Sequence, residues 1–174
     1  MTEDQKTFLR KHVIEQKSYD TICRELNFSR VTLSQWYEEL TEERTEIAKI
    51  RTVWTRKRFT PEFADFYDWY ISKDHKCEYC GITEAEIGYL LEKRELSTKR
   101  ITTRGRTLEF DRKDPNLAYS ELNNIVLACY WCNNAKTDTF TYEEFKIVGE
   151  VFSRIWKERY RKALDKVSPL SPFT

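Results

Sequence analysis

Apolar residues recur at helical spacing over most of this chain, beginning with its first forty residues. Within 19–40 the apolar positions stop and restart around a short break, which predicts two helices joined by a tight turn. Asn27 falls in the break, and asparagine tolerates a left-handed backbone better than most residues with a side chain. Ser29 is a good N-cap, so the second helix is predicted to begin at Arg30.

Helical spacing continues beyond this first part. Residues 41–59 form a long, mostly polar helical pattern with few apolar anchors, which is typical of a connector between domains. Thr60 and Pro61 have the residue types of an N-cap and a first helical position, so a further helix with an aromatic stripe is expected to start there. Packing in a core explains that stripe better than base stacking does.

Two later helices are predicted from capping boxes, in which a hydroxyl residue precedes a glutamate by three positions. Thr83 with Glu86 and Thr141 with Glu144 have this spacing, which predicts one helix of about ten residues and a long final helix. The apolar face expected for the final helix consists of Phe145, Val148, Phe152, Ile155 and Trp156.

Strand patterns flank a loop that is broken by Pro115. Short strands are expected over 108–111 and 125–129, followed by a helix that opens near Cys132. The predicted fold class is therefore α+β and mainly α. Its expected parts are a helix-turn-helix bundle over 1–40, a helical connector over 41–75, and a hairpin-and-helix domain over 76–174 that includes the final helix.

Four of the five cysteines form two C-x-x-C pairs, Cys77 with Cys80 and Cys129 with Cys132. A two-residue spacer lets both thiolates of a pair face one ion, and two such pairs complete a tetrahedral zinc site. Two disulfides or a redox-active pair are the alternatives. Structural Zn²⁺ is favoured over both, because the chain shows no secretory signal and neither pair lies in a strand-helix-strand context.

A second metal site is predicted beside the later cysteine pair. Asp111 leaves the first strand and Asn133 begins the helix, which brings a carboxylate oxygen close to an amide oxygen. Both are hard ligands suited to Mg²⁺ or Mn²⁺. Lys136 follows one helical turn later and is expected to contact a bound phosphate. Glu109 shares a strand face with Asp111, where it is interpreted as an exposed carboxylate in preference to an auxiliary ligand.

The charge of the chain is balanced overall but uneven along its length. Its 174 residues have a formal net charge of +1, yet 44–58 holds six basic residues against one acidic and 93–113 holds eight against three. Such clusters favour a polyanionic partner, because phosphate neutralisation dominates affinity for nucleic acids; a solvated charged surface is the alternative. Arg104 and Arg106 are therefore DNA-binding candidates. Without a signal peptide or a long apolar run, a cytoplasmic protein with no membrane contact is expected.

The hairpin and helix resemble the HNH nucleases of the ββα-metal superfamily. That family's pattern is roughly D-H, a dozen or more residues, and D-N-L-V-x-L-C-x-x-C-N-x-x-K; this chain has D-R and then N-N-I-V-L-A-C-Y-W-C-N-N-A-K. The resemblance implies that Asp111 and Asn133 bind the catalytic metal. It also makes Asn124 the middle asparagine, which braces the loop through backbone hydrogen bonds, and Lys136 the basic residue after the ligand.

One position departs from the family pattern, because Arg112 stands where the general-base histidine is expected. A guanidinium keeps its proton at any working pH, so it cannot accept one from water. Some members of the family look similar here, with D-R in place of D-H. Arg112 is instead expected to join Lys136 in offsetting charge on the phosphate. The base stays open between Asp114, His75 and the metal itself.

The N-terminal pattern resembles a helix-turn-helix of the resolvase and transposase type, on the residues Y-D-T-I-C-R-E-L-N-F-S-R-V-T-L-S-Q-W-Y-E-E-L. The resemblance places Arg30, Ser34 and Gln35 on the outward face of the second helix, where a major-groove reader makes base contacts. Residues 1–40 hold six basic and seven acidic side chains, so a bundle used for packing or dimerisation is the alternative.

The two resemblances together imply a metal-dependent DNA endonuclease that hydrolyses phosphodiester bonds and is positioned by its helix-turn-helix. The expected partner is double-stranded DNA, with a homodimer as an option, and the setting is restriction or a phage. Two other functions stay open at this point: a zinc-stabilised DNA-binding protein that is catalytically silent because Arg112 replaced the base, and a nuclease directed at RNA.

Overall fold

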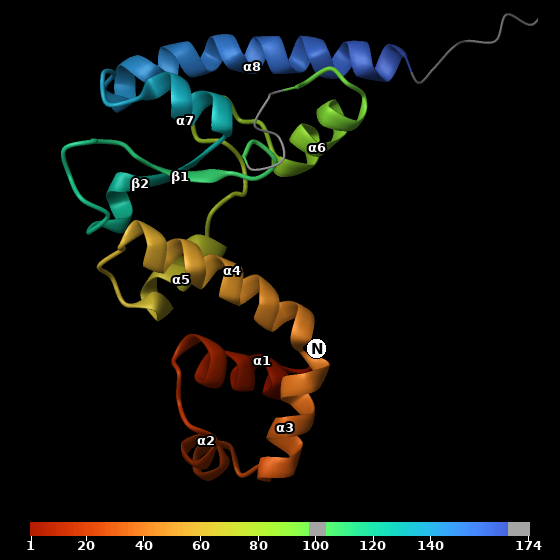
Figure 1. The fold of residues 1–174 in the computed structure, drawn as a ribbon, viewed down its shortest axis with the longest axis vertical. Helices are drawn as coiled ribbons and strands as arrows, with labels where there is room; N and C mark the ends of the chain where they lie inside the picture. The colour runs from red at the N-terminus through yellow and green to blue at the C-terminus, as the bar shows by residue number, and fades with distance from the viewer. Residues whose placement is uncertain (98–103, 167–174) are drawn as a thin grey trace, which may run out of the picture. The chain divides into compact units, whose positions relative to one another are not determined.

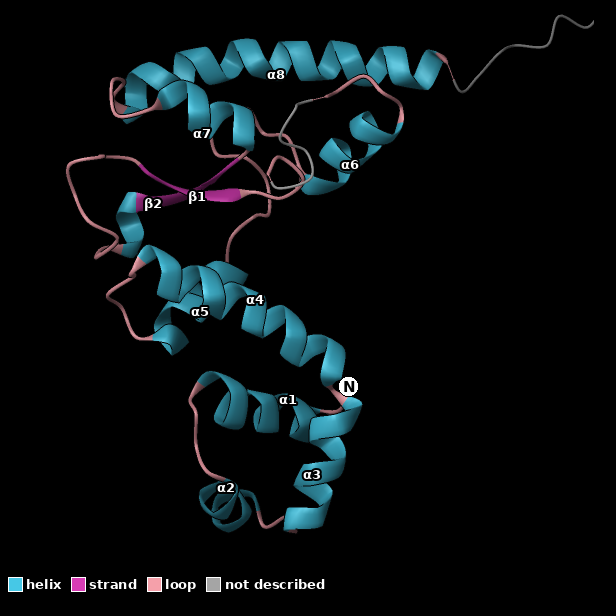
Figure 2. Ribbon diagram, viewed as in Figure 1, coloured by secondary structure: helices cyan, strands magenta, loops and turns pink. Residues whose placement is uncertain are grey.

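The computed structural model describes residues 1–97 and 104–166 (Figure 1). The chain divides into two compact units, unit 1 over 1–73 and unit 2 over 74–174. Helices predominate in both, and the strands of the described residues form one two-stranded sheet in unit 2 (Figure 2). The predicted fold class, α+β and mainly helical, is confirmed. Among the described residues, no helix combines the length and the apolar character that crossing a membrane requires.

Unit 1 is built from helices around a small aromatic and aliphatic core. Phe8, Ile22, Leu33 and Phe66 are each fully buried in it. The elements in chain order are α1 (Glu3–Leu9), the π-helical turn η1 (Arg10–Ile14), α2 (Tyr19–Leu26), α3 (Arg30–Glu39), α4 (Thr41–Lys57) and α5 (Phe63–Ile71).

The turn between α2 and α3 has the conformation that the sequence predicts. Asn27 ends α2 with a φ of 56° in the left-handed region. Ser29 then caps α3, because its hydroxyl accepts a hydrogen bond of 3.0 Å from the backbone N–H of Thr32. Two helices joined by this turn pack against each other, with Ile22 and Leu33 buried between them and the rest of the unit.

Helices α4 and α5 pack within unit 1, against the turn η1. The guanidinium of Arg51 on α4 donates to the carbonyl oxygen of Val13, and Arg10 pairs with both carboxylate oxygens of Asp68 on α5. The start predicted for α5 is wrong by two residues, since the helix begins at Phe63. The indole of Trp54 donates to the carbonyl of Pro61 at 3.0 Å, which holds that segment as a turn.

Unit 2 places three helices around a β-hairpin. Strands β1 (Glu109–Arg112) and β2 (Ile125–Ala128) are antiparallel, with Asp111 opposite Val126. The other elements are α6 (Glu84–Glu92), the 3-10 turn η2 (Leu122–Asn124), α7 (Tyr130–Lys136) and α8 (Tyr142–Asp165). Figure 1 shows α6, α7 and the hairpin together on one side of α8. Both predicted capping boxes are present, at the starts of α6 and α8.

Two details of unit 2 differ from the sequence-based expectations. Helix α7 begins at Tyr130, two residues before the predicted start, because the sulfur of Cys129 accepts the backbone N–H of Cys132 and caps the helix. Asn133 is consequently the fourth residue of α7 and not its first. On α8, Ile155 is 39% exposed and lies outside the buried face to which the sequence pattern assigned it.

Candidate functional site

The four paired cysteines form one buried cluster in unit 2. Their sulfur atoms all lie within 4.8 Å of one another, and the sulfurs of Cys80 and Cys129 are 3.7 Å apart. Sulfurs arranged tetrahedrally at about 2.3 Å from a zinc ion are about 3.8 Å from each other. Cys77, Cys80, Cys129 and Cys132 therefore fit a structural zinc ion in both ligand type and spacing, as the sequence predicts.

The charge balance of this cluster also calls for a cation. Hydrogen bonds from Cys129 and its other sulfur neighbours lower the pKa of the Cys77 thiol, whereas the bond to Cys129 and burial raise the pKa of Cys132. All four sulfurs ionise together only when a divalent ion compensates their charge.

The first cysteine pair is tied to the hairpin through the backbone. Gly81 has a φ of +76°, which lets the chain turn back so that its N–H donates to the carbonyl of Cys77 at 2.8 Å. The N–H of Glu78 donates to the carbonyl of Leu127 in β2, also at 2.8 Å. A zinc ion bound by both pairs would therefore fix the knuckle, the hairpin and the start of α7 relative to one another.

Asp111 lies beside this cluster, on the face of β1 opposite to the buried Phe110. Its Oδ2 accepts a hydrogen bond of 2.7 Å from the hydroxyl of Tyr79, which belongs to the first cysteine knuckle. The same oxygen is 3.6 Å from the ammonium nitrogen of Lys136. No hydrogen bond within the described residues involves the other oxygen, Oδ1. Burial, followed by the bond to Asp111, raises the pKa of Tyr79 far above its usual range, so the hydroxyl acts as a donor.

Asn133 on α7 contacts β1 at Glu109, which lies two residues before Asp111 on the same strand. Its amide nitrogen donates to Oε2 of Glu109 at 2.6 Å. Glu109 also accepts two hydrogen bonds from Arg104, at 2.8 and 2.5 Å. With its nitrogen bound in this way, Asn133 presents its amide oxygen, and that oxygen has no hydrogen-bond partner in the part of the chain that is described. Asp111 and Asn133 therefore each offer one oxygen for a cation.

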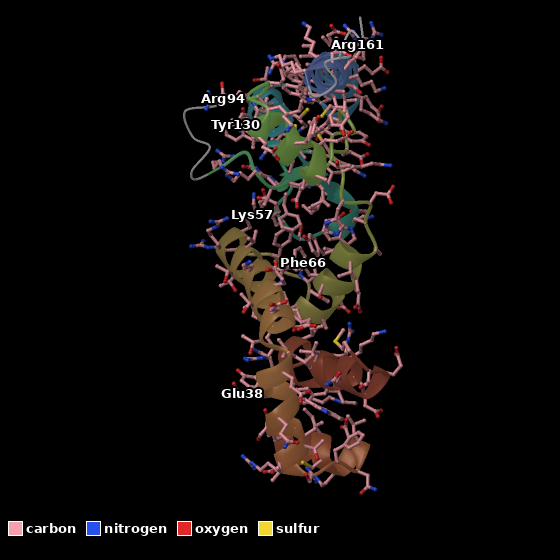
Figure 3. The ribbon with its side chains drawn as sticks, turned by 90° about the vertical axis from the view of Figure 1, so that its right-hand side faces the viewer. Glu38, Lys57, Phe66, Arg94, Tyr130 and Arg161 are labelled. Atoms are coloured by element: carbon pink, nitrogen blue, oxygen red, sulfur yellow. The ribbon has the colours of Figure 1, made fainter. Side chains whose placement is uncertain are left out.

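Glu109 and Arg104 take different positions from those expected. The side chain of Glu109 is 17% exposed and is held between Arg104 and Asn133, so it is not the exposed strand carboxylate that its position suggested. Arg104, expected to bind DNA, directs its guanidinium to Glu109 and lies over the ring of Tyr130, which Figure 3 labels. The neighbouring Arg106 is exposed, and no ion pair involves it within the described residues.

Lys136, for which a phosphate contact is expected from the sequence, is fully buried. Its ammonium donates to the carbonyl oxygen of Arg112 at 2.8 Å and lies near Asp111. A buried lysine requires a negative partner, and the Asp111 carboxylate supplies it. The observed role of Lys136 is to hold the end of β1 and to balance the charge of Asp111.

Asn124 and Arg112 organise the loop between the strands. The amide of Asn124 is buried, accepts the N–H of Asp114 at 2.9 Å and donates to the carbonyl of Asp114 at 3.1 Å. The guanidinium of Arg112 donates to the carbonyl of Leu117 at 3.1 Å and lies over Tyr119. Within the described residues that guanidinium does not contact Asp111 or Asn133, because adjacent residues of a strand point to opposite faces.

Two of the candidate bases occupy the loop between the strands and the segment before the first knuckle. Asp114 accepts hydrogen bonds from both the backbone and the amide of Asn116, and His75 is an exposed residue before the first knuckle. The sequence analysis missed Tyr79, whose partner Asp111 stands thirty-two positions away. The position of Tyr79 between two zinc-ligand candidates could have pointed to it, because a residue there must lie where the knuckle packs against the hairpin.

The outward face of α3 in unit 1 is the other candidate binding surface. Arg30, Ser34 and Gln35 are all exposed, and the guanidinium of Arg30 pairs with the exposed Asp20 and lies over the ring of Tyr19. Val31 joins them with 69% of its surface exposed. This face thus combines a cation, two hydrogen-bonding side chains and one aliphatic side chain, the kinds of group that read base edges in a major groove.

Comparisons with known proteins found one solved structure similar to this chain. It is that of the rare-cutting HNH restriction endonuclease PacI, with 30% sequence identity, 62% of this chain and 79% of that chain covered, and a TM-score of 0.49. A superposition at that TM-score is too loose to establish which residues correspond. No family model and no curated protein matches the chain.

Proposed function

We propose that this protein is a zinc-stabilised HNH endonuclease that hydrolyses phosphodiester bonds in double-stranded DNA with the help of Mg²⁺ or Mn²⁺. One observation carries the proposal. Within the described residues, Asp111 on β1 and Asn133 on α7 each have one oxygen without a hydrogen-bond partner, while Tyr79, Lys136 and Glu109 hold their other polar atoms. A carboxylate and an amide oxygen are the ligands that a hydrated Mg²⁺ accepts, together with substrate phosphate.

The chain's own residues have distinct tasks in this scheme. Asp111 and Asn133 bind the cation, which when present stabilises charge on the phosphate and on the leaving oxygen. Tyr79 and Lys136 orient and balance Asp111, and Glu109 turns the amide of Asn133 so that its oxygen faces the cation. Asn124 holds the loop that follows β1. Arg106 is the exposed cation placed to meet the DNA backbone near this site.

Arg112 favours a second candidate, a protein that binds DNA without cutting it. A guanidinium cannot accept a proton, and its observed contacts with Leu117 and Tyr119 direct it to the loop. In that case water activation would be lost while the zinc-stabilised fold and the DNA-binding surfaces persist. A nuclease directed at RNA is a third reading, which differs only in the substrate that the same site accepts.

Cleavage of supercoiled plasmid across a series of divalent metals tests the proposal. The parental protein should nick or linearise the plasmid with Mg²⁺ or Mn²⁺ and leave it intact with a chelator that spares the structural zinc. Asp111→Ala should abolish cleavage, whereas Asp138→Ala, an exposed acid of the same unit, should leave it unchanged. Plasmid that is retarded on a gel but never cut would support the silent binder, and cleavage confined to RNA would support the third reading.

A further inference from the structure

The outer face of α8 carries a stripe of exposed aliphatic side chains. Ile147, Val151 and Ile155 are 69%, 53% and 39% exposed and follow one another at intervals of four residues. The opposite face of the helix is buried in the core of unit 2 through residues such as Phe145 and Trp156. Single exposed aliphatic residues are common, but three in register along one helix form a continuous apolar strip.

Charged residues border this stripe in a particular order. At about 100° per residue, Glu143, Glu150, Arg154 and Arg161 lie along one edge of it, and all four are exposed. The acidic pair precedes the basic pair along the helix. Within the described chain, neither Glu150 nor Arg154 takes part in an ion pair.

Two copies of this helix edge bring opposite charges together only when the second helix runs antiparallel to the first. In an antiparallel pair of α8 helices that cross at Val151, Ile147 of one copy meets Ile155 of the other. Along the charged edge, Glu150 then lies near Arg154 of the second copy, whereas Arg161 is already paired with Glu158 and Asp165 of its own chain. Parallel helices would bring Glu150 against Glu150 and Arg154 against Arg154, which is repulsive.

We infer that the chain forms a two-fold symmetric homodimer in which the outer faces of two α8 helices pack antiparallel. Such an interface is isologous, so the same strip serves both copies. Antiparallel packing also opposes the two helix dipoles. The hairpin, α6 and α7 lie on one side of α8 (Figure 1), and the strip consists of side chains that they leave exposed, so the dimer leaves the Asp111 and Asn133 cluster uncovered.

Sedimentation of the full zinc-loaded chain over a range of concentrations tests this inference. The parental protein should sediment as a dimer at tens of micromolar, and Val151→Glu should raise the dimer dissociation constant by about ten-fold or more. Ile71→Glu is the matched control, because Ile71 is 56% exposed, close to the 53% of Val151, but ends α5 in unit 1. Circular dichroism and zinc content should stay unchanged in both variants. A monomeric parent, or a Val151→Glu protein that dimerises like the parent, would overturn the inference.

A charge swap tests the antiparallel arrangement. Glu150→Arg and Arg154→Glu should each weaken dimerisation, because each places like charges together on the edge of the strip. The double variant with both substitutions should recover most of the parental dissociation constant, since the pairs are restored with their signs exchanged. A double variant that is weaker than either single variant would contradict the antiparallel register.

Discussion

The hydroxyl of Tyr79 donates a 2.7 Å hydrogen bond to Oδ2 of Asp111 and so joins the first cysteine knuckle to the proposed metal ligand. The knuckle is held by its own backbone turn and, through Glu78, by β2. A structural metal site and a site for chemistry are therefore linked by a single side chain. Variants at Tyr79, Gly149 and Cys80 probe that linkage.

Replacing Tyr79 by phenylalanine should slow metal-dependent plasmid cleavage by roughly ten-fold. The substitution removes one hydrogen bond to a charged carboxylate and leaves the ring in place, and such a bond contributes about 1.5–3 kcal/mol. The rate should fall mainly because the site binds Mg²⁺ more weakly. Measuring the cleavage rate as a function of Mg²⁺ concentration would show this loss of affinity. Tyr89→Phe is the control, because the Tyr89 ring packs on Tyr160 and its hydroxyl makes no hydrogen bond within the described residues. Equal rates for both variants would remove Tyr79 from the site.

Gly149→Ala should destabilise unit 2. A Cβ at Gly149 would lie 2.4 Å from the carbonyl oxygen of Tyr79, so α8 and the knuckle would have to separate. Overpacking of this kind costs about 1–3 kcal/mol in the free energy of unfolding. Gly88→Ala is the matched control: a Cβ there meets no atom within 4 Å, and alanine should stabilise α6 by up to about 1 kcal/mol. Chemical denaturation would show the two effects with opposite sign.

Loss of a zinc ligand should unfold unit 2 selectively. Cys80→Ser removes one of the four clustered sulfurs, and a three-sulfur site binds zinc less tightly, so the hairpin and α7 lose their common anchor. Elemental analysis should find one zinc ion per parental chain and much less in the variant. Hydrogen exchange should show protection lost in 74–166 and kept in the core of unit 1. Cys23→Ser, which lies outside the cluster, should bind zinc as the parent does.

The Arg10 and Asp68 pair should stabilise unit 1 at neutral pH, and this contribution should be lost in acid. The hydrogen bonds from Arg10 lower the pKa of Asp68 below its ordinary value of 3.8. A depressed carboxylate pKa contributes stability that is present above the ordinary pKa and is lost as the pH falls through the folded value. Asp68→Asn should therefore lower the melting temperature of unit 1 at pH 7 by a few degrees, and the difference should vanish near pH 2. A constant difference at both pH values would contradict this coupling.

Substitutions on the exposed face of α3 should change the affinity for DNA, with loss of a basic residue weakening it and loss of an acidic residue strengthening it. Arg30→Ala should weaken binding to a preferred duplex by about 1–3 kcal/mol if Arg30 contacts a base, and by less if it contacts only phosphate. Glu38→Gln, near the other end of the same helix, should strengthen binding slightly because it removes a charge that repels phosphate. Fluorescence anisotropy at fixed salt measures both effects. Unchanged affinity in Arg30→Ala would favour a packing role for the bundle.

The sequence by itself determined the features that depend on near neighbours. Asn27, Ser29 and the two capping boxes act within three or four residues, and the two C-x-x-C spacers fix which sulfurs can share an ion. Their geometry follows from local backbone chemistry, so the helix turn, most helix starts and the cysteine cluster could be predicted. The types of the two proposed metal ligands were visible for the same reason.

Only the tertiary structure decided how distant elements share the remaining atoms. The burial of Lys136, the capture of Arg104 by Glu109 and the bond from Tyr79 to Asp111 all depend on how the knuckle and α7 pack on β1. Helical periodicity likewise predicts on which side of α8 Ile155 lies. It does not predict how much of the helix surface the neighbouring elements cover, and Ile155 lies outside the covered part. Such choices are made by packing, because an oxygen or an aliphatic surface is free only when no other element has reached it.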